Sequence, residues 1–226
     1  VTVTVGDLPT GFFVADDGTH GAELWKYDGT SIEMLKDINP SRGSEPDELV
    51  SIFGELFFTA NDGSNGRELW HSDGTEAGTT LLRDINTGDS SANPRNLTAV
   101  GNTLYFTAND GGNGAELWKY NVSTYDATTI EMVADIRAGE ESSAPQDFTN
   151  VNGTLFFTAN DGTTGRELWR SDGTTDTTNQ VKDINLTEDA NPFFLTAFDQ
   201  TLYFVANDGE HGYELWRSDG SNTGTS

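Results

Sequence analysis

The sequence predicts an all-β chain, folded as a five-bladed β-propeller with one four-stranded antiparallel blade in each repeat. The first observation is a segment with the core Glu-Leu-Trp that recurs five times and contains every tryptophan of the chain. These are Trp25, Trp70, Trp118, Trp169 and Trp216, which lie 45, 48, 51 and 47 residues apart. Units of this length, too small to bury a core alone, stack on their neighbours. The second observation is that no helical apolar period is sustained anywhere.

The third repeat shows the four strands expected in each blade. A short apolar segment ends at Val100, and the turn signal Gly101-Asn102 separates it from a strand rich in aromatic and β-branched residues at 103–108. A glycine-rich turn at 109–114 leads to a strand at 116–120, and a polar segment leads to the last strand at 129–136. The second strand is almost continuously apolar, which predicts a sheet packed on both faces.

The repeats predict a single domain, 1–226, with approximate blades at 1–40, 41–87, 88–138, 139–186 and 187–226. The segments add up to 19 strands, one fewer than five complete blades require. Either the segment VTVTV at 1–5 is the first strand of blade 1 and blade 5 lacks its outer strand, or VTVTV completes blade 5. A third alternative is that the chain is a fragment of a longer array. An open blade edge would allow self-association.

The composition excludes several classes of partner. The chain has 37 Asp and Glu against 12 Lys and Arg, a formal net charge of −25, which repels nucleic acid and anionic membranes and attracts cations. There is no cysteine, so a disulfide framework and a thiolate metal site are excluded. No apolar run approaches the roughly 18 residues that insertion into a membrane as a helix requires.

The motif resembles the ELWxxDGT-repeat family of bacterial proteins. The match is complete in GAELWKYDGT (21–30), GRELWHSDGT (66–75) and GRELWRSDGT (165–174). Ser221 replaces the final Thr in the last repeat, and Asn121-Val122-Ser123 replaces Asp-Gly-Thr in the third. The resemblance covers essentially the whole chain, and it implies a bacterial extracellular or cell-surface location more than it implies an activity.

Acidic residues recur at three positions of the repeat and are the candidate metal ligands. The glycine turn supplies Asp17, Asp62, Asp110, Asp161 and Asp208. The following strand supplies Glu23, Glu68, Glu116, Glu167 and Glu214. The fourth strand supplies Asp37, Asp84, Asp135 and Asp183. Oxygen ligands on short glycine-rich loops suit Ca²⁺, so we expect these acids to form a calcium-binding rim. The alternative is that each turn aspartate only accepts hydrogen bonds from nearby backbone amides.

Other residues give weaker signals. The five tryptophans are expected in the core between blades, not in sugar-stacking sites. Phe193-Phe194 replaces the polar pairs Asp47-Glu48, Arg95-Asn96 and Gln146-Asp147 of the other repeats, and it marks the last repeat as different. The acids occur in equivalent copies, which argues against the unequal carboxylate pair of a glycoside hydrolase.

Three functions remain open at this stage. The first is a non-enzymatic extracellular scaffold or adhesion module that binds calcium ions and other surface proteins. The second is a multivalent carbohydrate-binding module with a shallow glycan site in each blade. The third, which has the least support, is a glycoside hydrolase; no catalytic residue is predicted.

Overall fold

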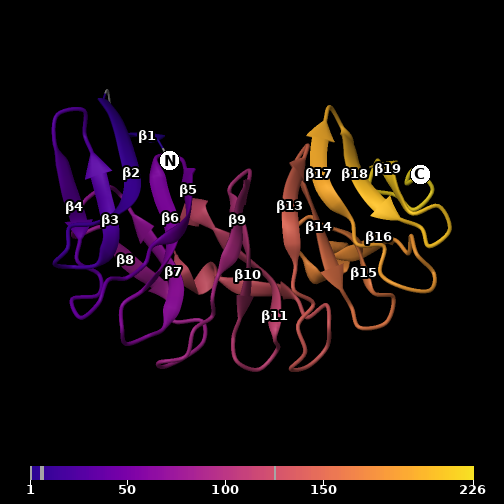
Figure 1. Cartoon of the computed structure of the whole chain (residues 1–226), viewed down its shortest axis with the longest axis horizontal. Helices are drawn as coiled ribbons and strands as arrows, with labels where there is room; N and C mark the ends of the chain where they lie inside the picture. The colour runs from indigo at the N-terminus through magenta and orange to yellow at the C-terminus, as the bar shows by residue number, and fades with distance from the viewer. Residues whose placement is uncertain (1, 6–7, 125) are drawn as a thin grey trace. The chain divides into compact units, whose positions relative to one another are not determined.

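The chain forms five separate antiparallel sheets, one for each repeat (Figure 1). The computed structural model describes residues 2–5, 8–124 and 126–226, with side chains placed from residue 11 onward. Val1, the first residue of the predicted strand at 1–5, lies outside the described residues. The strands lie close to the expected segments because each is an apolar run bounded by glycine, asparagine or aspartate.

The sheets follow one another along the chain. The first sheet contains β1 (Thr2–Val5), β2 (Leu8–Asp16), β3 (Ala22–Tyr27) and β4 (Ile32–Lys36). The second contains β5 (Asp47–Ile52), β6 (Glu55–Asn61), β7 (Arg67–Ser72) and β8 (Thr80–Arg83). The third contains β9 (Arg95–Val100), β10 (Thr103–Asn109), β11 (Ala115–Asn121) and β12 (Glu131–Ala134). The fourth contains β13 (Gln146–Val151), β14 (Thr154–Asn160), β15 (Arg166–Ser171) and β16 (Asn179–Lys182). The fifth contains β17 (Phe193–Phe198), β18 (Thr201–Asn207) and β19 (Tyr213–Ser218).

The prediction of a five-bladed propeller with four strands in every blade is wrong. The described residues form five separate sheets, none of them closed, and the fifth sheet has three strands. Ser226 exchanges two backbone hydrogen bonds with Arg217 of β19, at N–O distances of 2.9 and 3.1 Å. The segment at 2–5 pairs with β2 in the first sheet, as the first of the two alternatives for VTVTV required.

The contacts divide the chain into two compact units. One runs to Leu97 and includes Ala108–Gly111, and the other comprises Thr98–Thr107 and Gly112–Ser226. Helical structure in the described part of the chain consists of the 3₁₀ turns Val122–Thr124, Ala127–Thr129 and Thr175–Thr177. None of these could cross a membrane, since all are too short.

Within each unit, neighbouring sheets pack face to face. Side chains alternate across each strand, so every sheet has two faces. We call the face that carries the leucine of the Glu-Leu-Trp segment the forward face, and the face that carries the tryptophan the rear face. In the first sheet the forward face carries Phe12 and Leu24, which pack on Phe58 and Trp70 of the second sheet. The same packing joins Tyr105 and Leu117 to Phe157 and Trp169. It also joins Phe156 and Leu168 to Leu202 and Phe204.

This packing accounts for the tryptophans. Trp70, Trp118 and Trp169 are buried on rear faces, as expected for core residues, so their rings are closed to a sugar. Trp25 donates its indole N–H to the Ala15 carbonyl at 2.9 Å. The second strands of the second, third and fourth sheets, β6, β10 and β14, are apolar on both faces because both faces are buried.

Candidate functional site

The turn aspartates fold their own turns. Asp62 Oδ1 accepts the amides of Ser64 and Asn65, both at 2.8 Å. Asp161 Oδ1 does the same with Thr163 and Thr164 at 2.8 Å. Two such amide bonds make an Asx turn, which was the structural alternative in the sequence. These carboxylate oxygens are therefore already hydrogen-bonded within the turn.

Two of these turns also contain a histidine. His20 Nδ1 lies 2.8 Å from Asp17 Oδ2, and His211 Nδ1 lies 2.7 Å from Asp208 Oδ2. The backbone and side-chain hydrogen bonds from His20 lower the pKa of Asp17 to about 2. The bond from the His211 side chain is the main cause of the lowered pKa of Asp208. Each histidine thus completes the turn that holds it.

In four of the five repeats the glutamate is a buried clamp: its carboxylate accepts backbone amides of the connection to the next sheet, and its assignment as a calcium ligand stays a prediction. Glu23, Glu68, Glu116 and Glu167 are fully buried. Glu167 accepts the amides of Ile184 at 3.0 Å and Ala190 at 3.1 Å, at the two ends of the connection to the fifth sheet. Glu214, in the last repeat, is exposed. The physical reason is that backbone amides of the connection need a buried acceptor, which the carboxylate supplies.

The clamps come in two chemical versions. Glu23 accepts the Ser44 hydroxyl at 2.6 Å, and Glu116 accepts the Ser143 hydroxyl at 2.5 Å. The corresponding contacts of Glu68 and Glu167 are to the amides of Ala92 and Ala190, which have no hydroxyl. Burial raises the pKa of Glu68 and of Glu167 to about 7, but that of Glu116 only to about 6. The serine hydroxyl therefore stabilises the charged carboxylate.

The fourth-strand aspartates contain oxygen atoms without a donor. Oδ2 of Asp84 accepts the Gly88 amide at 3.1 Å, and Oδ2 of Asp135 accepts the Gly139 amide at 3.2 Å. The Oδ1 atoms of Asp37, Asp84 and Asp183 are buried without a hydrogen-bond partner. A buried acceptor that recurs unpaired in three sheets can accept an ion, a water molecule or a ligand donor.

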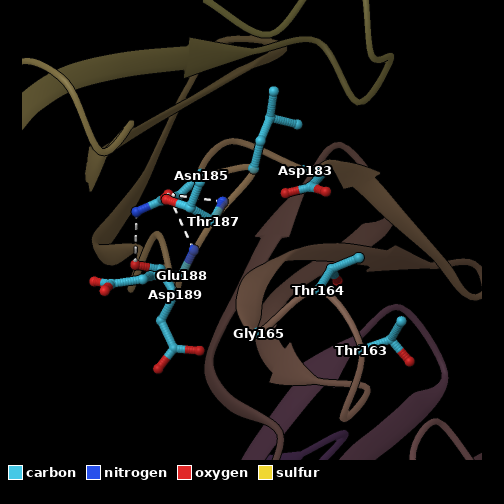
Figure 2. A pocket seen from close by; sticks show the side chains of 9 residues that line it. Thr163, Thr164, Gly165, Asp183, Asn185, Thr187, Glu188 and Asp189 are labelled. Atoms are coloured by element: carbon cyan, nitrogen blue, oxygen red, sulfur yellow. Dashed lines mark hydrogen bonds between the residues drawn. The ribbon is translucent and has the colours of Figure 1, made fainter.

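Asp183 lies in a polar hollow of about 270 Å³. The glycine turn of the fourth sheet and the connection to the fifth sheet form its walls (Figure 2). It is lined by Thr163, Thr164, Gly165, Asp183, Asn185, Leu186, Thr187, Glu188 and Asp189. In Figure 2, Asp183 and the threonines of the turn face Asn185, Thr187 and Glu188 across the hollow.

Local hydrogen bonds hold this hollow open. Asn185 Oδ1 accepts the amides of Thr187 and Glu188, both at 3.2 Å, which folds the connection into a compact loop. Asp189 Oδ1 accepts the Arg166 amide at 2.7 Å and joins that loop to β15. Asp183 Oδ1 is buried without a hydrogen-bond partner, and the carboxylates of Asp183, Glu188 and Asp189 give the lining of the hollow a negative charge.

The residues of this hollow suit a cation in part. In the described part of the chain, no three His, Cys, Asp or Glu side chains form a group that could hold a metal ion. A calcium ion here would take Asp183 Oδ1, hydroxyl and carbonyl oxygens of the loops, and water molecules, since Ca²⁺ accepts all of these. The calcium assignment of the repeated Asp and Glu residues, Asp110 and Glu214 included, stays a prediction.

Two of the basic residues that follow a tryptophan, Lys26 and Lys119, join neighbouring sheets. Lys26 pairs with Glu33 at 2.9 Å and also donates to the Gly74 carbonyl of the next sheet at 3.0 Å. Lys119 pairs with Glu131 at 2.9 Å and donates to the Gly173 carbonyl at 2.8 Å. The sequence gives no signal for the carbonyl acceptors, because every residue supplies a backbone carbonyl.

No protein-family model matches this chain, and no curated protein matches it. Solved structures match it by fold. A structure of puromycin hydrolase aligns with a TM-score of 0.60 and 16% identity, covering 97% of this chain and 36% of that one. A structure from a study of two prolyl endopeptidases aligns with a TM-score of 0.60 and 12% identity, covering 97% of this chain and 33% of that one. This chain thus spans about a third of the length of these proteins, and at such identities the likeness concerns the fold alone.

Proposed function

We propose that this chain is a non-enzymatic extracellular binding module whose acidic loops bind Ca²⁺, with the hollow at Asp183 as the principal site. The observation that carries the proposal is the buried, unpaired Oδ1 atom of Asp37, Asp84 and Asp183. An ion would satisfy these oxygens, and the net charge of −25 would favour its approach.

The chemistry of the hollow favours a weak site. The hollow has three carboxylates, and one of them, Asp189, already accepts the Arg166 amide. Sites with few charged ligands have dissociation constants of about 10⁻⁴–10⁻³ M, the range used by extracellular calcium modules. A weak site is therefore consistent with the bacterial cell-surface location that the sequence resemblance implies.

The buried glutamates support the non-enzymatic part of the proposal. A glycoside hydrolase needs an acid and a second carboxylate that both reach the substrate. Glu68, Glu116 and Glu167 have raised pKa values, but they are fully buried and hydrogen-bonded to backbone amides. They act as structural acceptors in this proposal.

The test is calorimetric titration and thermal unfolding with Ca²⁺, with Mg²⁺ and a chelator as references. We expect Ca²⁺ to raise the melting temperature selectively, since a ligand that binds only the folded state stabilises it. Asp183→Asn should weaken the effect. The matched control is Asp135→Asn, at the same strand position in the third sheet, where the aspartate is exposed to solvent. An absent calcium effect, or an equal loss in both variants, contradicts the proposal.

A carbohydrate-binding module is the second candidate, and the shape of the hollow favours it. A volume of about 270 Å³ lies just below the usual size of small-ligand pockets. Thr163, Thr187 and Asn185 offer polar groups to a polyhydroxylated ligand, whose hydroxyl could donate to Asp183. Binding on a glycan array that persists in chelator, and that Asp183→Asn removes, would favour this candidate over calcium.

A further inference from the structure

The forward face of the fifth sheet is apolar and exposed. On the fourth sheet the forward-face residues Leu168 and Val151 are 0% and 5% exposed. Their counterparts on the fifth sheet, Leu215 and Phe198, are 73% and 66% exposed. The register confirms the correspondence, because Leu215 pairs with Val205 as Leu168 pairs with Thr158. The forward face of the fifth sheet therefore corresponds to a face that, on the fourth sheet, is buried against a neighbouring sheet.

The composition of this face differs from that of the rest of the molecule. Phe193 lies beside Tyr213 on it, with ring centroids 5.5 Å apart, and Phe194 packs on Phe193 at 4.9 Å. Phe194 occupies the strand position of Glu48, whose carboxylate accepts an amide of the following sheet at 3.1 Å. The one charged side chain that strand pairing places on this face beside the apolar residues is Arg217. An apolar patch without carboxylates is unusual on a chain of net charge −25 and marks an interaction surface.

The rear face of the first sheet is the other exposed half. Tyr27 and Ile32 pair with each other at its edge and are 43% and 63% exposed. The third sheet has the same residue types at the same positions, and there Tyr120 and Ile130 are 2% and 0% exposed. Phe13 and Trp25, further along this rear face, are half-buried where Phe157 and Trp169 are buried.

We infer that the forward face of the fifth sheet binds the rear face of the first sheet of a second copy of this chain. The repeat supplies the reason: a forward face packs on a rear face of the same composition within both units. The contact joins two different surfaces, so it is head-to-tail and leaves a free face at each end. It uses sheet faces and is distinct from pairing at an open strand edge.

Charge opposes this assembly at a distance. Two chains of net charge −25 repel, and the repulsion is screened over about 8 Å at 0.15 M salt. The apolar contact is buried and depends little on salt. Self-association should therefore strengthen as salt concentration rises.

Sedimentation velocity over a dilution series tests the inference. We expect the wild-type chain to form dimers and longer species as its concentration rises. Leu215→Asp on the forward face and Ile32→Asp on the rear face should each sediment as a monomer, and both sites are exposed enough to leave folding intact. Phe53→Asp is the matched control, since Phe53 is 69% exposed in the turn between β5 and β6 and belongs to neither face, and it should assemble like the wild type.

Mixing the variants decides the geometry. Leu215→Asp keeps an intact rear face and Ile32→Asp keeps an intact forward face, so their mixture should form a dimer that grows no further. A wild-type chain that stays monomeric throughout the series overturns the inference. So does a mixture of the two variants that remains monomeric, because a head-to-tail contact requires that this pair associate.

Discussion

At the residue scale, one hydrogen-bond partner of the repeated glutamate differs between repeats. Glu23 and Glu116 each accept a serine hydroxyl, whereas Glu68 and Glu167 meet an alanine at that position. The hydroxyl donates to the charged form of the carboxylate and to no other group within the clamp. The difference between Ser and Ala therefore sets how strongly burial penalises the glutamate charge.

Ala190→Ser should stabilise the protein above neutral pH. Ser44 and Ser143 show that this position accommodates a hydroxyl when the clamp closes around it. A hydrogen bond to a charged group contributes roughly 1.5–3 kcal/mol, so a gain of about 1–2 kcal/mol is expected for Glu167 in its ionised form. Urea unfolding at alkaline and at acidic pH measures it, and the gain should shrink at acidic pH, where Glu167 is protonated.

Ala206→Ser is the control for this substitution. Ala206 is buried in the cluster of Leu202 and Phe204, so the same hydroxyl should lower stability there. A gain of equal size at Ala206, or a loss at Ala190, would show that the clamp does not depend on the hydroxyl.

At the scale of the element, the glycine turn is fitted against the connection that follows the fourth strand. Gly114 has a φ of 69°, and a Cβ atom there would lie 2.5 Å from the Glu141 carbonyl oxygen. Gly212 occupies the same turn position in the last repeat with a φ of 82°, and a Cβ atom there meets nothing within 4 Å. The two glycines share a backbone conformation and differ in what surrounds them.

Gly114→Ala should therefore cost more stability than Gly212→Ala. The left-handed backbone costs an alanine about 1–2 kcal/mol at either site. At Gly114 the backbone of the connection must also move, which adds to the loss. Urea unfolding of the two variants gives the difference. Equal losses would mean that the connection is free to shift away from the turn.

The strands could be predicted from the sequence because the same strand and turn signals recur in each repeat. The apolar run of β14, the turn Asn160-Asp161-Gly162 and the Glu-Leu-Trp strand recur in all five repeats, with Asp16 in place of the asparagine in the first, so the strands and their order could be predicted. The role of Glu167 could not be predicted from the sequence. Its partners are the backbone amides of Ile184 and Ala190, and almost every residue carries such an amide. The free oxygen of Asp183 likewise depends on which amides the connection leaves unused.

At the scale of the whole molecule, the number of repeats did not determine the closure of the fold. Five copies of one motif suggested a five-bladed propeller, but the described residues form five separate sheets, and the fifth has three strands and an exposed forward face. Local sequence specifies each sheet, whereas the completeness of the last one depends on residues beyond its third strand.

The stability of the fold should decrease both when the pH falls below about 4 and when it rises towards 7. The pKa values of Glu68 and Glu167 rise from 4.5 to about 7 on folding, so the folded state binds more protons between these values and stability falls as pH rises through them. The pKa of Asp17 falls from 3.8 to about 2, so its contribution is lost as pH falls below 3.8. Thermal unfolding across this range should give a stability maximum near pH 4–5. A maximum at alkaline pH would contradict the burial of the clamps.

The double variant Ala92→Ser, Ala190→Ser separates the clamps from the general repulsion of the charged chain. Repulsion among surface carboxylates also lowers stability as pH rises, but about 1 M salt reduces its range to about 3 Å. The buried glutamates are shielded from salt, so their share of the slope should survive in salt and flatten in the double variant. One pKa unit corresponds to about 1.4 kcal/mol, so shifting both clamps by a unit should recover up to about 3 kcal/mol at alkaline pH. If salt alone abolishes the dependence of stability on pH, that dependence comes from the surface carboxylates and the buried glutamates do not contribute to it.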